Sequence, residues 1–546
     1  MTGMSIAEVR GWNPVTFGTA AAAASARAAD IESSMTSADE AVGSAEQWAG
    51  PSGDAARRGF RAALEQSREL RNLLLCIADD ADDAGREVGS ARNHLLELVN
   101  ACRPDIVGDD GGVTDPDGNP VPDSTNRVRT ALSEVYRQDG LFASALAETA
   151  QALRLTAAEP ARVPAPNGAT TSAAEAIRQV REMSIDERQE YFTRLSPAEQ
   201  RALLSSDPQT IGNTDGVPFG LRIAANDVNI RNARETELRK PPAERDQSLI
   251  ARYTSMVDQP IDEPRPVDNR GDNTTERQFV AFDPHGQGRW IEQVGRITPS
   301  ARGVGVYVPG TGTTLSGSDA NLRSARSLAR ESGGAVFVYA DGDLPDDIPH
   351  ASVPWYASSM SPRLVEFGHA LDLEIDSTAP GLKTTYVGHS YGGVVVGHAE
   401  ELGLRADHVI YASSPATGLM PLHPWTNPAH DVQRYSLTAP GDFIQDAQEL
   451  GLFDGNDPDA HPKITRLDTG YYGDGRLVEG QHSHGDYWND PDSDAFKNMA
   501  RVIGGDRPTP YVRRKADTHP GQVVENTIET ASEAWGVPNL LRLGHP

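Results

Sequence analysis

The chain has 546 residues, several times the ~150 that set a prior for one domain, so two or three domains are expected. Hydrophobic residues make up 38% and charged residues 23%, which is typical of a soluble globular protein and excludes fibrous and wholly disordered classes. Fifty basic residues against 78 acidic ones leave a net charge of -28, which repels phosphate backbones and anionic lipid. This balance argues against a nucleic-acid binder.

The sequence predicts neither a transmembrane segment nor a secretory signal peptide. Apolar runs such as Ala20–Ala24 are far shorter than the ~20 residues of a membrane helix, and the first residues lack basic and apolar signal regions. Two cysteines, Cys76 and Cys102, are too few for a disulfide scaffold or a thiolate zinc site. We expect a cytoplasmic protein, or one exported without a signal peptide.

Residues 1–158 are predicted to form an α-helical hairpin or bundle domain. Apolar residues recur every three or four positions from Thr19 to Ala45 and from Asp54 to Asn100, with Trp48-Ala49-Gly50-Pro51 in the turn between these helices. A third helix is predicted from Asn126 to Leu155. This region carries no candidate catalytic group, and its helices are a candidate surface for a protein partner.

The acidic segment Gly108–Ser124 lies between the second and third helices. Its Asp115-Pro116-Asp117-Gly118-Asn119 has the outline of a calcium loop, but the twelfth position is Asn126 rather than Glu. Asp, Asn, Gly and Pro favour turns, so we interpret the segment as a solvated turn.

Composition also suggests the remaining domain boundaries. Residues 159–171 are predicted as a Pro/Ala linker, and residues 172–274 as a helical connector that ends in a proline-rich loop from Pro241 to Asn273. Within the connector, Ser196-Pro197-Ala198-Glu199 predicts a helix start with a capping box. Residues 506–546 are predicted as a tail with one helix at Val523–Ala534.

Residues 275–505 have the pattern of an α/β domain. Short β-branched runs alternate with helical runs, which is typical of βαβ units and a mostly parallel sheet flanked by helices. The predicted strands are Gln278–Asp283, Val304–Val308, Ala335–Tyr339, Thr384–Val387, His408–Tyr411, Val432–Leu437 and Ile464–Asp468.

Gly388-His389-Ser390-Tyr391-Gly392 is a G-x-S-x-G pentapeptide between a predicted strand and a predicted helix. Strand, sharp turn and helix form the nucleophile elbow, in which small residues allow the turn that lifts the serine hydroxyl above the sheet. An ordinary Gly-rich turn is the alternative interpretation. Ser390 is therefore the candidate nucleophile.

An elbow serine needs two N–H groups that bind the oxyanion. Tyr391, after the serine, supplies the first. The Gly/Thr loop that follows Val304–Val308 supplies the second, and Thr311 is our candidate because it follows the first glycine of that loop. A phosphate-binding loop is the other interpretation, but G-x-x-x-x-G-K-[ST] is absent from the sequence.

The acid and the base should follow the serine in that chain order. Asp442 stands on a turn after Val432–Leu437, with Asp446 as the second choice. His482 and His484 both lie in a loop before the last helix, and we favour His484 because Gly485 beside it permits a tight turn. The H-x-H pair could hold a metal, but no third ligand with zinc-site spacing accompanies it.

Two aromatic segments predict the substrate-binding surface. Trp355 and Tyr356 lie in one, and Met420 and Trp425 in the other, and such segments can form a lid or an acyl pocket as well as an ordinary surface loop. With Ser390, His484 and Asp442 as a triad, the chemistry requires no metal and no organic cofactor.

Residues 277–504 resemble the α/β-hydrolase superfamily. The branch that is most similar is an uncharacterised actinobacterial one with a V-P-G-T-G-T loop, a G-H-S-Y-G-G elbow and a late H-x-x-Y, here Val308–Thr313, Gly388–Gly393 and His484 with Tyr487. The late motif favours His484 as the base. Leu195–Leu204 and Ile211–Gly216 are similar to the segment that precedes this domain in that branch.

The N-terminal hundred residues resemble the Trp-x-Gly helical hairpins of type VII secretion, through Trp48-Ala49-Gly50. Substrates of that system carry Tyr followed four residues later by Asp or Glu, whereas Tyr136 is followed by Gly140. The missing signal argues against export by this route, although the lack of a signal peptide suits such export and a partner protein could supply the signal.

The sequence thus predicts a serine hydrolase of esterase or lipase type that acts on a small-molecule ester or lipid. Amidase, peptidase and thioesterase chemistry use the same residues and stay open. The alternatives are a non-catalytic interaction or secretion-associated protein that uses the hydrolase fold as a scaffold, and a secreted lipid-hydrolysing effector.

Overall fold

A computed structural model describes residues 5–44, 51–158, 162–257, 277–351, 355–419, 424–429, 431–450, 453 and 455–513. The chain forms two compact units, Met1–Met183 with Glu190–Ile211 and Ser184–Gln189 with Gly212–Pro546. The segment 172–274 therefore contributes to both units. The domain boundaries drawn from composition remain predictions.

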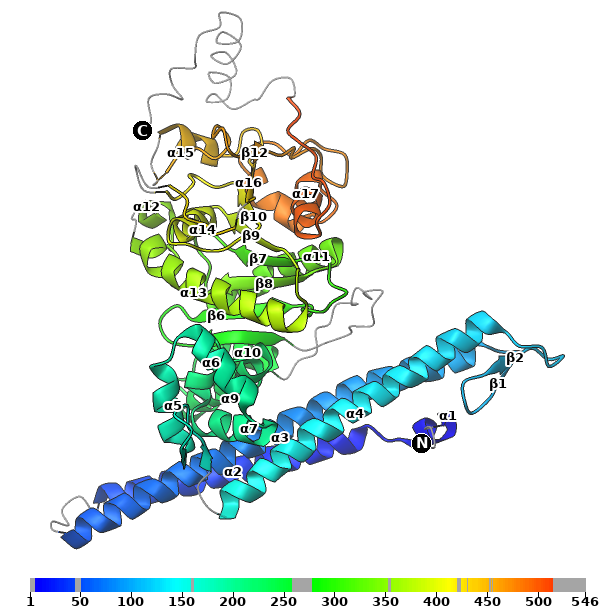
Figure 1. Cartoon of the computed structure of the whole chain (residues 1–546), viewed down its shortest axis with the longest axis vertical. Coiled ribbons are helices and arrows are strands. Elements are labelled where there is room, and N and C mark those ends of the chain that lie inside the picture. The colour runs from blue at the N-terminus through cyan, green and yellow to red at the C-terminus, as the bar shows by residue number, and fades with distance from the viewer. Residues whose placement is uncertain are drawn as a thin grey trace, which may run out of the picture. The chain divides into compact units, whose positions relative to one another are not determined.

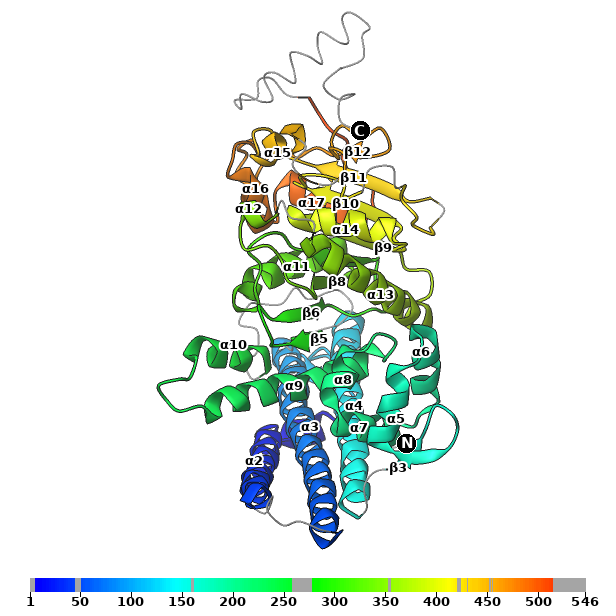
Figure 2. The same cartoon turned by 90° about the vertical axis from the view of Figure 1, so that its left-hand side faces the viewer.

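Long helices build the first unit, as the spacing of its apolar residues predicts. After the short α1 (Ile6–Gly11), helices α2 (Val15–Ser44) and α4 (Pro122–Ala158) both pack along α3 (Pro51–Ala101) (Figure 2). Alanine and other small residues recur at the buried positions of α2 and α3, which lets the helix backbones approach closely. The turn with Trp48-Ala49-Gly50 lies outside the described residues.

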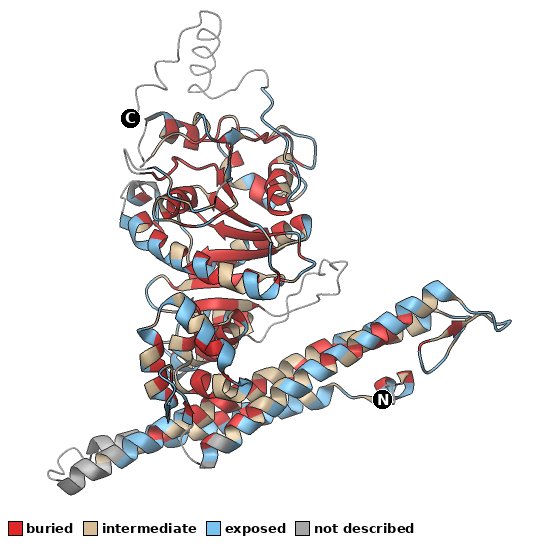
Figure 3. Cartoon of the chain, viewed as in Figure 1, coloured by how far each residue is buried: buried red, intermediate tan, exposed pale blue. Residues whose placement is uncertain are grey.

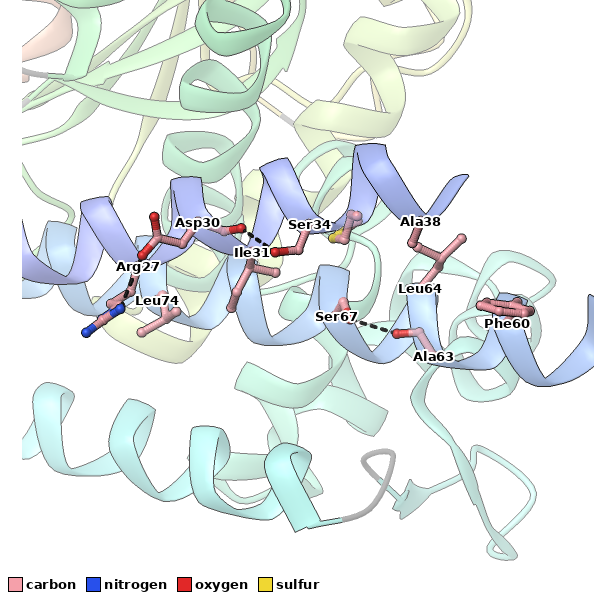
Figure 4. Close-up of a pocket in the computed structure, with 11 residues that line it drawn as sticks. Arg27, Asp30, Ile31, Ser34, Ala38, Phe60, Ala63, Leu64, Ser67 and Leu74 are labelled. Atoms are coloured by element: carbon pink, nitrogen blue, oxygen red, sulfur yellow. Dashed lines mark hydrogen bonds and ion pairs between the residues drawn. The ribbon is translucent and has the colours of Figure 1, made fainter. Parts of the chain in front are cut away.

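An apolar groove of ≈ 610 Å³ lies between α2 and α3 (Figure 4). Ile31 and Met35 line it from α2, and Leu64 and Leu74 line it from α3. Phe60 also contributes to the lining, and 48% of its surface is exposed. The groove is thus an exposed apolar surface of the helical unit.

Two hairpins interrupt the helices of this unit. Strands β1 (Ile106–Val107) and β2 (Val113–Thr114) pair antiparallel, and the Asp115 carboxylate accepts hydrogen bonds from the Asp117 and Asn119 amides at 3.0 and 2.8 Å. Asp115 thus forms a local turn, as the composition of its segment predicts. The predicted linker instead contains a second hairpin, β3 (Arg162–Pro164) and β4 (Thr170–Ser172), since Asn167-Gly168 supplies a tight turn.

The helices that follow are α5 (Ala173–Arg181), α6 (Ile185–Arg194), α7 (Pro197–Ser206), α8 (Pro208–Asn213), α9 (Phe219–Arg239) and α10 (Gln247–Val257). Helix α7 starts at the predicted Ser196 capping box. It joins the first unit, where Asn72 donates a hydrogen bond to the Ser205 carbonyl at 2.8 Å. The prediction of a proline-rich loop from Pro241 is wrong for residues 247–257, which form α10. This helix has the sequence QSLIARYTSMV, and its Tyr253 and Met256 are buried.

The second unit contains an eight-stranded sheet in the order β12-β11-β10-β9-β7-β8-β6-β5 (Figure 1). Pairing is parallel from β12 to β8. Strand β6 pairs antiparallel with β8, and β5 pairs antiparallel with β6. The strands are β5 (Gln278–Asp283), β6 (Arg289–Val294), β7 (Val304–Val308), β8 (Ala335–Ala340), β9 (Thr384–His389), β10 (His408–Ala412), β11 (Gln433–Leu437) and β12 (Thr465–Arg466).

Strand β6 is the one that the sequence pattern misses. Its sequence RWIEQV places the charged Glu292 in the middle of a strand, which weakens the hydrophobic pattern. In the fold Glu292 is buried, and both of its oxygens accept hydrogen bonds from Arg277 at 2.8 Å. Arg277, which lies 15 residues earlier in the chain and outside the strand, therefore compensates for the buried charge.

Helices cover both faces of the sheet (Figures 1 and 3). Alternate residues of β8 face opposite ways: Phe337 packs with α13 (Trp355–Thr378) and α14 (Tyr391–Glu401), whereas Val338 packs with α11 (Ser318–Ser332) and α17 (Asp494–Ile503). The sheet is buried on both faces, as expected for a parallel sheet. Shorter elements are η1 (Leu315–Gly317), α12 (Ile348–Ala351), α15 (Ile444–Leu450), α16 (Ser483–Asp486) and η2 (Tyr487–Asn489).

Polar side chains cover the outer edge of β5. Asn213 accepts a hydrogen bond from the Phe282 amide at 2.8 Å and donates one to the Phe282 carbonyl at 3.0 Å. Arg222 and Asn226 donate to the carbonyls of Val280 and Phe279 at 2.8 and 2.9 Å. Asn213 and helix α9 thus supply hydrogen-bond partners to an edge strand that would otherwise expose unpaired backbone groups.

Within the described part of the chain, no helix combines the length and the apolar character that crossing a bilayer requires. The helix predicted at Val523–Ala534 lies outside the described residues.

Candidate active site

Ser390 lies in a sharp turn between β9 and α14. Its backbone has φ 53° and ψ -125°, a conformation that L residues rarely adopt and that costs about 1–3 kcal/mol. Glycines permit the turn, because a Cβ on Gly388 would lie 2.5 Å from the Gly392 carbonyl and one on Gly392 would lie 2.1 Å from the Val308 carbonyl. Ser390 therefore has the strained conformation of a nucleophile elbow.

The loop after β7 passes directly beside Ser390. A Cβ on Gly310 would lie 2.7 Å from the Ser390 Cβ and 3.3 Å from its Oγ. Thr311, the next residue, is half-buried, and its amide forms no hydrogen bond with any other described residue. Tyr391 is the first residue of α14, where the helix dipole favours negative charge. Of the two predicted oxyanion donors, Thr311 thus follows the glycine that lies beside Ser390, and Tyr391 follows Ser390 in the chain.

The predicted acid and base form a hydrogen-bonded pair. His484 Nδ1 lies 3.0 Å from Asp442 Oδ1 and 3.2 Å from Oδ2, and the Asp442 side chain is fully buried. The Ile444 amide donates a further hydrogen bond to Asp442 Oδ1 at 3.0 Å. His482 and Asp446, the competing candidates, are both exposed.

This contact determines which nitrogen of His484 is basic. An ionised carboxylate only accepts hydrogen bonds, so the Nδ1 that faces Asp442 carries the proton. In the neutral ring Nε2 then has the free lone pair that can accept a proton. The ring of Phe443 packs against the His484 ring with centroids 4.4 Å apart.

His389, which the sequence interpretation passed over, connects the elbow to the loop of His484. Its Nε2 donates a hydrogen bond to the backbone carbonyl of His484 at 2.9 Å, and the two rings have centroids 5.0 Å apart. Burial, followed by the charge of His484, lowers the pKa of His389 to about 3. The imidazole is therefore neutral at physiological pH. The only feature of the sequence that could have pointed to His389 is its position immediately before Ser390.

A second contact holds the same loop. The Tyr487 hydroxyl lies 3.1 Å from Ser413 Oγ, and burial raises the pKa of this phenol strongly. Ser413 follows β10 and has φ 45°, a second non-glycine residue in the left-handed region. The Ser390 amide also donates to the Ala412 carbonyl of this strand at 2.9 Å. The predicted late H-x-x-Y motif thus bonds to the neighbouring strand end.

The predicted substrate residues separate into three groups. Trp355, 58% exposed, contacts Tyr356 edge-on at 5.1 Å between centroids, and Tyr356 contacts Tyr391 at 6.5 Å. The Tyr391 hydroxyl accepts a hydrogen bond from the Ala357 amide at 3.0 Å, so the start of α13 is joined to the elbow. Met420 lies outside the described residues.

Trp425 lies beside the start of β11. Its ring packs under the guanidinium of Arg434 at 4.0 Å, and Arg434 pairs with the buried Glu400 at 2.7 Å. Glu400 is near the end of α14, which spans ~16 Å from Ser390. The structure therefore does not bring Trp425 to the serine.

Among the described residues, no group of three or more His, Cys, Asp or Glu side chains is arranged to hold a metal ion.

The chain is similar to two uncharacterized proteins of Mycobacterium tuberculosis, Rv2079 of one strain and its counterpart in another. Each is 24% identical over 405 residues, which cover 66% of this chain. The chain spans 58% of the length of these relatives.

Three solved structures illustrate a weaker similarity. An ester hydrolase from the metagenome of Lake Arreo is 14% identical, with TM-score 0.30 and coverage of 50% of this chain and 97% of that one. A hyperthermophilic esterase from Pyrobaculum calidifontis is 13% identical, with TM-score 0.29 and coverage of 50% and 93%. The esterase LipW from Mycobacterium marinum is 13% identical, with TM-score 0.27 and coverage of 50% and 89%.

A family model described as alpha/beta hydrolase matches residues 283–452. This range begins at the end of β5 and contains the Gly310 loop, the Ser390 elbow and Asp442. With its mostly parallel eight-stranded sheet and flanking helices, the second unit contains an α/β-hydrolase domain, and a helical region precedes it in the chain.

Proposed function

We propose that the protein is a serine hydrolase that cleaves carboxylic esters through Ser390, His484 and Asp442. One observation carries this proposal. The strained Ser390 is adjacent to His389, and His389 is hydrogen-bonded to the backbone of His484. The ring of His484 is in turn paired with the buried Asp442. Nucleophile and base thus belong to segments in direct contact.

In the proposed mechanism, Ser390 Oγ attacks the ester carbonyl carbon while His484 Nε2 accepts the hydroxyl proton. The tetrahedral intermediate collapses, the alkoxide leaves with that proton, and an acyl-enzyme remains. Water then attacks the acyl carbon and gives a proton to His484, and the carboxylic acid is released as the proton returns to Ser390. Asp442 stabilises the imidazolium in both halves of the reaction.

The amides of Thr311 and Tyr391 are proposed to bind the oxyanion. Thr311 follows the glycine that touches Ser390, and Tyr391 begins the helix behind it. Such preorganised donors stabilise the charge that develops on the carbonyl oxygen, by about 3–4 kcal/mol for each donor. Neither step needs a metal or an organic cofactor.

The substrate is proposed to present an apolar acyl or alkyl group. The aromatic rings of Trp355, Tyr356, Tyr391 and Phe453 form a continuous series of contacts that begins at the residue after Ser390. Aromatic and aliphatic side chains provide the main binding area of most small-molecule sites. This arrangement favours an ester or a lipid over a strongly charged substrate.

Fluorophosphonate labelling tests the proposal directly. Wild-type protein should be labelled and Ser390→Ala should not, while p-nitrophenyl esters of increasing chain length should separate esterase from lipase preference. A folded wild-type protein that is neither labelled nor active on any ester would refute the proposal. The non-catalytic scaffold predicted as an alternative from the sequence would then be the better description.

A further inference from the structure

We propose that His389 is a positioning residue that fixes the loop of the catalytic base against the nucleophile elbow. This inference rests on the proposed function of Ser390 and His484. His389 contacts no substrate in this proposal and acts through the main chain of His484.

The hydrogen bond has a defined direction. A backbone carbonyl only accepts, so the Nε2 of His389 carries the hydrogen and donates it to the His484 carbonyl at 2.9 Å. His389 is the last residue of β9, a central strand of the sheet, and the residue after it is Ser390. The bond therefore links the backbone of the base to the central strand that precedes the nucleophile.

The imidazole of His389 suits this role because it stays neutral. Burial among His484, Tyr487 and Trp488 lowers its pKa to about 3, and His484 is the charged neighbour that contributes to this shift. The proposed reaction creates an imidazolium on His484, whose ring lies 5.0 Å away. A permanently charged donor at position 389 would repel that cation, whereas a neutral donor holds the loop without repulsion.

The contact is one of three that hold the loop of His484. Its side chain is fixed by Asp442 at 3.0 Å, and its main chain is fixed by His389 at 2.9 Å. Three residues later, Tyr487 bonds to Ser413 at 3.1 Å. Because α16 is a single turn of four residues, the loop has little rigidity of its own and depends on these contacts.

Loss of the His389 bond should therefore displace Nε2 while the triad residues themselves remain. A misplacement of ~1 Å at a reacting group costs about 10²-fold in rate. We expect His389→Leu to lower the rate of fluorophosphonate labelling and kcat by about this factor with little change in KM, because the substrate surface is intact. His389→Gln has an amide donor of similar reach and should recover most of the loss.

The experiment measures labelling rate, kcat, KM and loop exchange on the full chain. His389→Leu, His389→Gln and the control His482→Leu, an exposed ring in the same loop, are compared with wild type. Hydrogen–deuterium exchange of peptides that cover residues 480–488, in a Ser390→Ala background, reports the loop without any need for activity. We expect faster exchange in His389→Leu alone.

The outcomes separate the two proposals. An unlabelled wild type whose loop exchange rises in His389→Leu would refute the catalytic proposal and leave the anchoring contact intact. A labelled wild type whose rate, KM and exchange are unchanged in His389→Leu would overturn the positioning role. Equal losses in the Leu and Gln variants would also overturn it, since the donor would then be irrelevant.

Discussion

His484 Nδ1 lies 3.0 Å from Oδ1 and 3.2 Å from Oδ2 of Asp442, a carboxylate that is fully buried. The two residues are 42 positions apart in the chain: Asp442 lies in the turn after β11, and His484 lies in α16. Because the carboxylate only accepts hydrogen bonds, this contact leaves Nε2 of His484 as the basic nitrogen.

Replacement of the acid tests this tautomer. We expect Asp442→Asn to keep the fold but to lower kcat/KM by about 10⁴-fold, as for the same change in serine proteases, because the amide can donate to Nδ1 and place the proton on Nε2. Ester hydrolysis by purified variants measures it. Asp446→Asn, an exposed residue on the following helix, is the control and should keep wild-type activity. The opposite pattern would assign the acid to Asp446.

The two histidines of the loop give a second prediction. His484→Ala should abolish labelling by fluorophosphonate, whereas His482→Ala should label at the wild-type rate because its side chain is exposed. Labelling followed by gel fluorescence measures both. Loss in the His482 variant alone would show that the wrong histidine has been chosen.

Gly310 provides a steric test of the oxyanion loop. A Cβ at this position would lie 2.7 Å from the Ser390 Cβ, so Gly310→Ala must displace the loop or the serine. We expect a folded protein with kcat/KM reduced by about 10²–10³-fold, the usual cost of losing one oxyanion donor. Gly317→Ala, whose new methyl would meet its nearest neighbour at 3.7 Å, is the matched control. Full activity in Gly310→Ala would place the oxyanion site elsewhere.

The edge of β5 gives a stability prediction. Asn213→Ala removes both side-chain hydrogen bonds to Phe282 and leaves its backbone amide and carbonyl without these partners. We expect the free energy of unfolding to fall by about 1–3 kcal/mol for each group left unsatisfied. Urea denaturation measures the loss, with Asn100→Ala, an exposed residue of α3, as control. Equal midpoints for the two variants would contradict the proposed edge protection.

The neutral state of His389 predicts a pH dependence of stability. In the unfolded chain this histidine binds a proton below its ordinary pKa of 6.5, whereas in the folded protein its pKa is about 3. Its contribution is therefore complete above pH 6.5 and is lost as the pH falls, with a slope of up to about 1.4 kcal/mol per pH unit. Urea denaturation between pH 7 and pH 4.5 should show a shallower loss for His389→Gln than for wild type. Parallel curves would contradict the neutral assignment.

The sequence alone was sufficient to predict the helical N-terminal region, the α/β class and seven strands of the sheet. These features depend on local patterns, such as the helical spacing that repeats along α3 and the short continuous apolar run of β8. The strand, sharp turn and helix around Ser390 were also predictable, since the glycines and the flanking strand and helix are adjacent in the chain. The order of serine, acid and base then restricted the remaining candidates to Asp442 or Asp446 and His484 or His482.

Tertiary structure decided what depends on residues far apart in the chain. Strand β6 was missed because Arg277 compensates for its buried Glu292 only after folding. Trp425 looked like a substrate residue, yet its ring packs under Arg434 near the start of β11. His389 was overlooked because its partner, the carbonyl of His484, is 95 residues away. Spacing in a sequence reports local geometry, whereas the partner of a buried polar group is set by which strand ends meet at one edge of the sheet.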